Sequence, residues 1–250
     1  HTRNIILGES LCRLFESVGN EVFRANYQGD IGLHVAKALW GIEKLGIISE
    51  KSNLEEKADF LGTTYTKGAK AYEENEGAKS EIQAINKQLY SRDPKILKIW
   101  QKTRQWSLDY FESIYQRMGV KFNGLFFESE VEAKGGEIVR NNIGSVFERD
   151  QGAIIFPGEK YGLHNRVFIT SEGNPTYEAK DLGRAEVERQ AFGFDKAVHV
   201  VAVDQTGYFQ VMFKALEMVD PQFQGKNQHL AYGMVNLASG KMSSRTGDVI

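Results

Sequence analysis

The stretch 196–205, KAVHVVAVDQ, decides the fold class. Its apolar residues run almost continuously instead of alternating, which is typical of a strand buried on both faces of a parallel sheet. The following residues, TGYFQVMFKALEMV (206–219), repeat apolar side chains at helical spacing and predict a helix directly after the strand. Ligands of open α/β sheets bind beyond the carboxyl ends of the strands, so Asp204 and Gln205 lie where a ligand would be met.

The same α/β pattern occurs at both ends of the chain. Residues 1–20 predict a helix that stops at Gly19-Asn20, and EVFRANYQGDIG (21–32) predicts a short strand closed by a tight turn. HLAYGMVNLASG (229–240) predicts one more strand near the carboxyl end. We therefore expect an α/β fold.

The middle of the chain has a different character. From Ile31 to about Gly119 the pattern is helical and polar, with breaks expected near Gly62 and at Asp93-Pro94. An aromatic-rich stripe between 96 and 118 indicates either a packed helix face or a surface for stacking RNA bases. GVKFNGLFFESE (119–130) predicts another strand with its turn, and 139–169 predict a small antiparallel sheet.

Composition excludes several classes of protein. The 250 residues are 41% hydrophobic and can bury a core, and 31 basic against 33 acidic residues give a net charge of −2. There is no global basic field, so any contact with a polyanion must be local. The single cysteine, Cys12, excludes an internal disulfide and a cysteine zinc cluster and favours a reducing cytosol. Without a membrane-length apolar run or a signal peptide, the sequence predicts a cytoplasmic protein with no membrane partner.

Two segments could meet phosphate groups. GKMSSRTG (240–247) gathers an ammonium, two hydroxyls and a guanidinium, and is either a solvated linker or a loop that wraps a polyphosphate. His1, just before the first helix, could add a donor at the helix start or be a plain exposed terminal residue. Because the chain starts without Met and stops abruptly, we expect a piece of a longer protein.

A third segment could bind a cation. In SEGNPTYEAKDLGRAEVER (171–189), Asn174 is expected to cap a helix that begins at Pro175. Tyr177 and Asp181 would then share one face, where an aromatic ring and a carboxylate suit a guanidinium; the alternative is an exposed, charged helix face. Gln205 could donate and accept hydrogen bonds to a polar ligand or be an ordinary turn residue.

Together these segments resemble the class I aminoacyl-tRNA synthetases, and the arginyl-tRNA synthetases in particular. KMSSR is similar to the KMSKS loop of that family, and HTRN resembles the end of its HIGH signature. RANYQGDIG is similar to N-Y-x-G-D-x-G, PTYEAKDLGRA to T-Y-x-x-x-D-L-A, and VDQTGYFQ to Q-x-x-H-F-Q. YGMVNLASGKMSSRTG resembles the G-M-V lead into the signature loop, and all matches occur in the family's order.

The resemblance implies a Rossmann-like, parallel-sheet catalytic domain that binds nucleotide and is split by a helical and β connective insertion. Its first part would be 1–50, the insertion 51–165 with a return to the sheet near 119–130, and the second part 166–250. The amino-terminal tRNA-binding domain and the carboxy-terminal anticodon-binding domain of the family would be absent, leaving a fragment that we expect to be inactive alone.

The resemblance also implies site residues. His1, Lys241 and Ser243 would be catalytic, and Tyr177, Asp181 and Gln205 would hold arginine. The residues implied to bind ATP are His1, Asn4, Gly233, Met234, Val235, Lys241, Met242, Ser243 and Ser244. Two positions depart from the family pattern: Ser244 replaces the second lysine of KMSKS, and Tyr208 replaces the histidine of Q-x-x-H.

The implied activity is the ATP-dependent joining of L-arginine to tRNA(Arg) by a monomer, with Mg²⁺ accompanying ATP and no protein-bound metal. Two alternatives stay open: another class I synthetase, such as the lysyl type, and a non-catalytic RNA-binding paralogue. The cysteinyl type would need a cluster of thiolates around zinc, which a chain with one cysteine cannot supply.

Overall fold

The computed structural model describes residues 2–234 and the backbone of 236–237 and 240–241. The chain divides into two compact units, each built from two segments. The first unit consists of His1–Gln28 and Phe122–Met234, and the second of Gly29–Lys121 and Val235–Ile250. Among the described residues, no helix combines the length and the apolar character needed to cross a bilayer.

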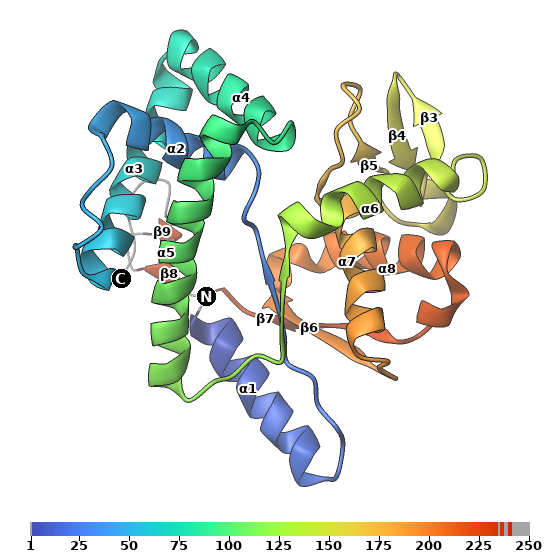
Figure 1. The fold of residues 1–250 in the computed structure, drawn as a ribbon. Coiled ribbons are helices and arrows are strands. Elements are labelled where there is room, and N and C mark those ends of the chain that lie inside the picture. Colours follow the sequence, from blue (N-terminus) through green and yellow to red (C-terminus); the bar gives the residue numbers. More distant parts are fainter. Residues whose placement is uncertain (1, 235, 238–239, 242–250) are drawn as a thin grey trace. The chain divides into compact units, whose positions relative to one another are not determined.

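The first unit mixes helices and strands (Figure 1). Its elements are α1 (Thr2–Ser17), β1 (Ala25–Gln28), β2 (Gly124–Phe127), α6 (Glu128–Asn141), β3 (Glu148–Asp150), β4 (Ala153–Phe156), η1 (Gly158–Tyr161), β5 (Arg166–Ile169), α7 (Tyr177–Ala191), β6 (Ala197–Ala202), η2 (Val203–Gln205), α8 (Thr206–Val219), η3 (Pro221–Phe223) and β7 (Asn227–Tyr232).

Parallel strand pairing confirms the α/β prediction. β1 pairs with β2, and β6 pairs with β7 from Ala197↔Asn227 to Ala202↔Tyr232. The expected burial of β6 on both faces is wrong, since all six of its residues are half-buried. In the described part of the chain β7 is the one strand paired with β6, so β6 is an edge strand there and not the central strand of a sheet.

The small antiparallel sheet expected within 139–169 is present as β3-β4-β5. It packs on α7 and α8 through a core in which Phe147, Phe156 and Phe168 are completely buried. The rings of Phe147 and Phe168 lie 4.8 Å apart, and burying each phenylalanine contributes roughly 1.5–3 kcal/mol to folding. Helix α6, which follows β2 directly, was not anticipated.

The second unit is helical, as its sequence predicts. Its elements are α2 (Leu33–Leu45), α3 (Leu54–Glu74), α4 (Glu76–Tyr90), α5 (Pro94–Met118) and the two-residue strands β8 (Asn236–Leu237) and β9 (Gly240–Lys241). The break at Asp93-Pro94 is confirmed, because the Asp93 carboxylate caps α5 by accepting from the Lys95 amide at 2.9 Å. The break near Gly62 is wrong, because α3 runs straight through that residue.

The aromatic stripe of 96–118 is a packed helix face over its first half. Ile96, Trp100 and Trp106 on α5 are buried, and the Trp100 indole donates a hydrogen bond to the carbonyl of Asp30 at 2.7 Å. Phe111, further along, is 39% exposed. Burial of the large rings therefore accounts for the helical spacing of aromatic residues over the first half of α5.

Candidate active site

The first residues of α1 meet the last residues of β7. The Tyr232 hydroxyl donates to the Asn4 Oδ1, and the Asn4 amide donates to the carbonyl of Val200 at 3.3 Å. The Arg3 guanidinium donates to the carbonyl of Gly233. Asn4 and Gly233, both implied to bind ATP, are thus held in neighbouring positions although they lie at opposite ends of the sequence.

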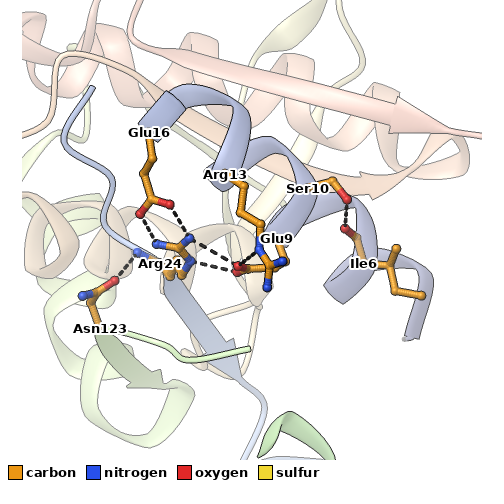
Figure 2. Close-up of polar contacts among 7 residues, drawn as sticks. All are labelled: Ile6, Glu9, Ser10, Arg13, Glu16, Arg24 and Asn123. Carbon is orange, nitrogen blue, oxygen red and sulfur yellow. Dashed lines mark hydrogen bonds and ion pairs between the residues drawn. The ribbon is translucent and has the colours of Figure 1, made fainter. Parts of the chain in front are cut away.

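Ionic contacts help to hold α1 in place, since none of its described residues is fully buried. Arg24, just before β1, points between two glutamates of α1 (Figure 2): its Nε lies 2.8 Å from Glu9, and its Nη1 lies 2.6 Å from Glu16. The Arg24 amide also donates to the Asn123 side chain at 2.8 Å. Hydrogen bonds from Arg24 lower the pKa of both glutamates, so both carboxylates stay charged and remain paired with the guanidinium.

Helix α7 carries the expected cation-binding residues, but it starts later than predicted. Its cap is Thr176 and its first residue is Tyr177, whereas Asn174 and Pro175 lie before the helix. The Thr176 amide donates to the carbonyl of Phe168 at 2.9 Å, and Pro175 forms a β-bridge with β5. These contacts extend the backbone along β5 as far as Thr176, and the helix can begin only after it.

Helix α7 is fixed closely against α6. A Cβ on Gly183 would lie 2.4 Å from the carbonyl of Val131, so only glycine permits this approach. Nearby, the Lys180 ammonium lies 3.1 Å from the Glu128 carboxylate, and both side chains are buried. The backbone that carries Asp181 therefore has little freedom to shift.

The buried carboxylate of Asp181 has two described neighbours. The Tyr208 hydroxyl, from α8, donates to Oδ2 at 2.6 Å, and the Arg184 Nε lies 3.2 Å from Oδ1. Burial, and then the charge of Asp181, raise the pKa of Tyr208 well above its usual value, so the phenol stays protonated as a donor. The side chain that replaces the family's histidine thus contacts the implied arginine-binding carboxylate directly.

The other two implied arginine-binding residues are exposed. Tyr177 is 58% exposed at the start of α7, with the Lys180 ammonium 5.3 Å from its ring centroid. Gln205 ends the 3₁₀ turn after β6 and precedes α8, as expected for a residue beyond a strand's carboxyl end. Tyr208, the partner of Asp181, comes one helical turn after Gln205.

Part of the implied site falls outside the described residues: His1, Val235, Met242, Ser243 and Ser244. Lys241 is described by its backbone alone, which pairs with Asn236 in the β8-β9 hairpin. Met234, the last residue with a described side chain, is 40% exposed. In the described part of the chain, no three His, Cys, Asp or Glu side chains come together as ligands of a metal ion would.

Sequence reasoning missed Arg184 and the role of Tyr208. The signal for Arg184 was present, because residues three apart on a helix are neighbours and a carboxylate three positions before an arginine forms an ion pair. No local signal could have shown the contact between Tyr208 and Asp181, which are 27 residues apart and lie on different helices.

Comparisons with known proteins bear on this arrangement. The family described as "tRNA synthetases class I (R), catalytic domain" matches residues 1–250. The arginine–tRNA ligase of Borrelia duttonii is 32% identical over 261 residues, which cover 100% of this chain and 45% of that protein. The arginine–tRNA ligase of Treponema pallidum is 31% identical, over 100% of this chain and 43% of that protein. The chain therefore spans less than half the length of these relatives.

Two solved structures show the same fold. Arginyl-tRNA synthetase from Plasmodium falciparum gives a TM-score of 0.74 at 18% identity, over 94% of this chain and 40% of that one. The Thermus thermophilus arginyl-tRNA synthetase gives 0.74 at 21% identity, over 97% of this chain and 47% of that one. The Rossmann-like α/β fold class is confirmed. Since the family match extends over every residue, this chain belongs to the catalytic-domain family of class I arginyl-tRNA synthetases.

Proposed function

We propose that the protein is an arginine–tRNA ligase, which activates L-arginine with ATP and transfers it to the 3'-terminal adenosine of tRNA(Arg). The observation that carries this proposal is the buried carboxylate of Asp181, 8% exposed, with the Tyr208 hydroxyl bound to one of its oxygens. Carboxylate and guanidinium are planar groups that match as two-pronged partners, so Asp181 suits an arginine side chain better than a lysine ammonium. Family membership supports the same substrate.

The reaction has two steps. An oxygen of the arginine carboxylate attacks the α-phosphorus of ATP, the bond to the β-phosphate oxygen breaks, and pyrophosphate leaves. The 2'-hydroxyl of the terminal tRNA adenosine then attacks the carbonyl carbon of arginyl-adenylate, and AMP leaves. The protein needs no covalent intermediate, because its task is to position the reactants and to stabilise the charge that develops on the phosphates.

Each group of site residues has a separate part in this proposal. Tyr177, Asp181 and Gln205 hold the arginine substrate. The ATP side is formed by His1, Asn4, Gly233, Met234, Val235, Lys241, Met242, Ser243 and Ser244, among which His1, Lys241 and Ser243 act on the phosphates. Mg²⁺ enters with ATP and is part of the substrate. We further propose a cytoplasmic monomer in which 51–165 are the connective insertion between the two parts of the catalytic domain.

The test of the substrate is arginine-dependent exchange of pyrophosphate into ATP by the full-length protein, with and without tRNA(Arg). Exchange with arginine supports the proposal. Exchange with lysine instead would indicate the lysyl type, and RNA binding without exchange for any amino acid would indicate the non-catalytic paralogue.

The substitution Asp181→Asn tests the carboxylate. It keeps the shape of the side chain and removes its charge, so we expect the KM for arginine to rise about a hundredfold, with the KM for ATP unchanged. Asp195→Asn, at an exposed position after α7, is the matched control and should leave both constants unchanged. An Asp181→Asn protein that still prefers arginine over lysine undiminished would refute the assignment.

The substitution Lys241→Ala tests the signature loop. If the lysine binds the phosphates most tightly in the transition state, its loss lowers kcat of activation more than it raises the KM for arginine. Single-turnover rates of adenylate formation measure this directly. Weaker arginine binding at an unchanged kcat would contradict the role proposed for Lys241.

A further inference from the structure

Beside Asp181, the protein places a guanidinium of its own. The Arg184 Nε lies 3.2 Å from Asp181 Oδ1, and the Arg184 Nη1 donates to Glu188 at 3.4 Å. The centre of the guanidinium lies 4.9 Å from the ring centroid of Tyr27, on β1. The carboxylate proposed to recognise a guanidinium substrate thus already faces one guanidinium within the protein.

Arg184 is a fixed part of this cluster. Its side chain is 11% exposed and is surrounded by two carboxylates and an aromatic face, the environment that stabilises a buried guanidinium. Moving it away would leave buried charges without compensation, which is costly. A substrate that had to displace Arg184 would bear this cost in every turnover.

The geometry leaves Asp181 able to bind a second guanidinium. A carboxylate has about four lone-pair positions on its two oxygens. The Tyr208 hydroxyl occupies one of them on Oδ2, and Arg184 faces Oδ1 as an ion pair. Oδ2 is therefore held by a hydrogen bond and Oδ1 by the charge of Arg184 alone, since the Arg184 Nε makes no hydrogen bond with a described residue, and both oxygens keep acceptor capacity for a ligand.

We propose that Arg184 is a positioning residue for the selection of arginine: together with Tyr208 it fixes the plane of the Asp181 carboxylate, so that both oxygens meet the planar guanidinium of the substrate. An unfixed carboxylate could rotate to meet the point charge of an ammonium equally well. This inference rests on the proposed function, since it assigns to Arg184 a part in recognising the same substrate.

The experiment compares Arg184→Met, which keeps an unbranched apolar stem and removes the charge, with Arg184→Lys, which keeps the charge and removes the planar group. Pyrophosphate exchange by the full-length protein gives kcat/KM for arginine and for lysine, and thermal unfolding reports the stability of each variant. Arg189→Met is the control, because Arg189 lies on the same helix but contacts Gln222 and the ring of Phe223.

We expect Arg184→Met to lower the arginine-to-lysine ratio of kcat/KM on the order of tenfold or more, mainly through the KM for arginine, with the KM for ATP unchanged. Arg184→Lys should recover part of the ratio, and Arg189→Met should leave it unchanged. An unchanged ratio in Arg184→Met, or a lower KM for arginine as expected of a competing side chain, would overturn the inference.

Should Arg184→Met fail to fold, Tyr208→Phe tests the positioning of Asp181 instead. This substitution removes only the hydroxyl oxygen that donates to Asp181 Oδ2. A reduced arginine-to-lysine ratio in Tyr208→Phe supports the positioning of Asp181, and an unchanged ratio overturns it. The wild-type protein separates the two proposals: absence of arginine-dependent exchange rejects the function itself, whereas normal wild-type exchange with an unaffected ratio in the variants rejects only the role of Arg184.

Discussion

Arg24 supplies ion pairs to a helix whose apolar face is only partly buried. On α1, Leu14 and Phe15 are 63% and 42% exposed, whereas Ile5, Leu7, Leu11 and Cys12 are half-buried. Arg24 itself is only 15% exposed and binds two carboxylates about two turns apart on that helix. Arg24 therefore adds ionic contacts at the carboxyl half of α1, while Arg3 and Asn4 hydrogen-bond at its amino end.

Replacing Arg24 with Gln should loosen α1 locally without unfolding the unit. The loss of the partly buried contact with Glu9 and of the exposed contact with Glu16 should give roughly tenfold faster amide exchange along the helix. Arg13→Gln is the control: its side chain is 63% exposed, and an exposed ion pair of this kind contributes less than about 1 kcal/mol. Hydrogen exchange resolved along the chain measures both variants, and equal protection of α1 in wild type and Arg24→Gln would contradict this role.

At the scale of elements, two glycines of α3 have opposite functions. A Cβ on Gly68 would lie 2.0 Å from the carbonyl of Lys37 on α2, whereas a Cβ on Gly62 would meet nothing within 4 Å. Gly68 thus permits the two helices to approach closely, and Gly62 only lowers the helix propensity of α3.

Alanine at these two positions should act in opposite directions. Gly68→Ala forces the backbones of α2 and α3 apart and should destabilise the second unit by about 1–3 kcal/mol. Gly62→Ala should stabilise it by about 1 kcal/mol, because alanine loses less backbone entropy in a helix. Amide exchange in α2 and α3 measures both variants. Similar effects of the two substitutions would show that helix propensity alone determines the stability change, and would contradict the role of Gly68 in helix packing.

The same glycines explain where sequence reading succeeded and where it failed. Gly62 was interpreted as a break, although Asn53 and Glu56 form a capping box that marks the true start of α3. In α6, Gly135 and Gly136 made the helix hard to predict. In a sequence, a glycine that is needed for close packing cannot be told apart from a glycine that ends a helix. The cap at Asp93 is local and could be read, but the cap of α7 was displaced from Asn174 to Thr176 by pairing with β5, and close approach between helices depends on a partner distant in the sequence.

At the scale of the whole molecule, the histidine at the centre of β6 links stability to pH. The His199 ring packs against Phe209 and Phe213 and donates to the Asn227 side chain at 3.1 Å. Burial lowers the pKa of His199 from 6.5 to about 3. The unfolded chain binds this proton below pH 6.5 and the folded chain does not, so the contribution is present above pH 6.5 and is lost as the pH falls toward 3.

Between pH 6.5 and pH 5 this group alone should reduce the free energy of unfolding by about 2 kcal/mol. His199→Gln cannot titrate and should flatten the curve in that range, while His164→Gln, at an exposed position, should leave its slope unchanged. Denaturant unfolding at several pH values tests this. A His199→Gln protein with the wild-type slope would assign the acid sensitivity to other groups.

The sequence predicts which segments contribute to the candidate site, but it does not predict which of their side chains meet in the folded chain. The motifs around Asp181 and Gln205 are local patterns, so the sequence can place these two residues in a candidate site. The contacts of Asp181 with Tyr208, and of Asn4 with Tyr232, bring together residues separated by 27 and 228 positions, and only the folded chain shows them. The contacts of the candidate site residues were therefore harder to predict than the segments that carry them.

The contact between Asn4 and Tyr232 also has a consequence for synthesis. A ribosome adds about 5–20 residues per second, so α1 is complete on the order of ten seconds or more before Tyr232 exists. During that interval the amino end of α1 lacks both the Tyr232 hydroxyl and the carbonyl of Gly233. A nascent chain that stops short of β7 therefore cannot form the contacts that join the amino end of α1 to the end of β7.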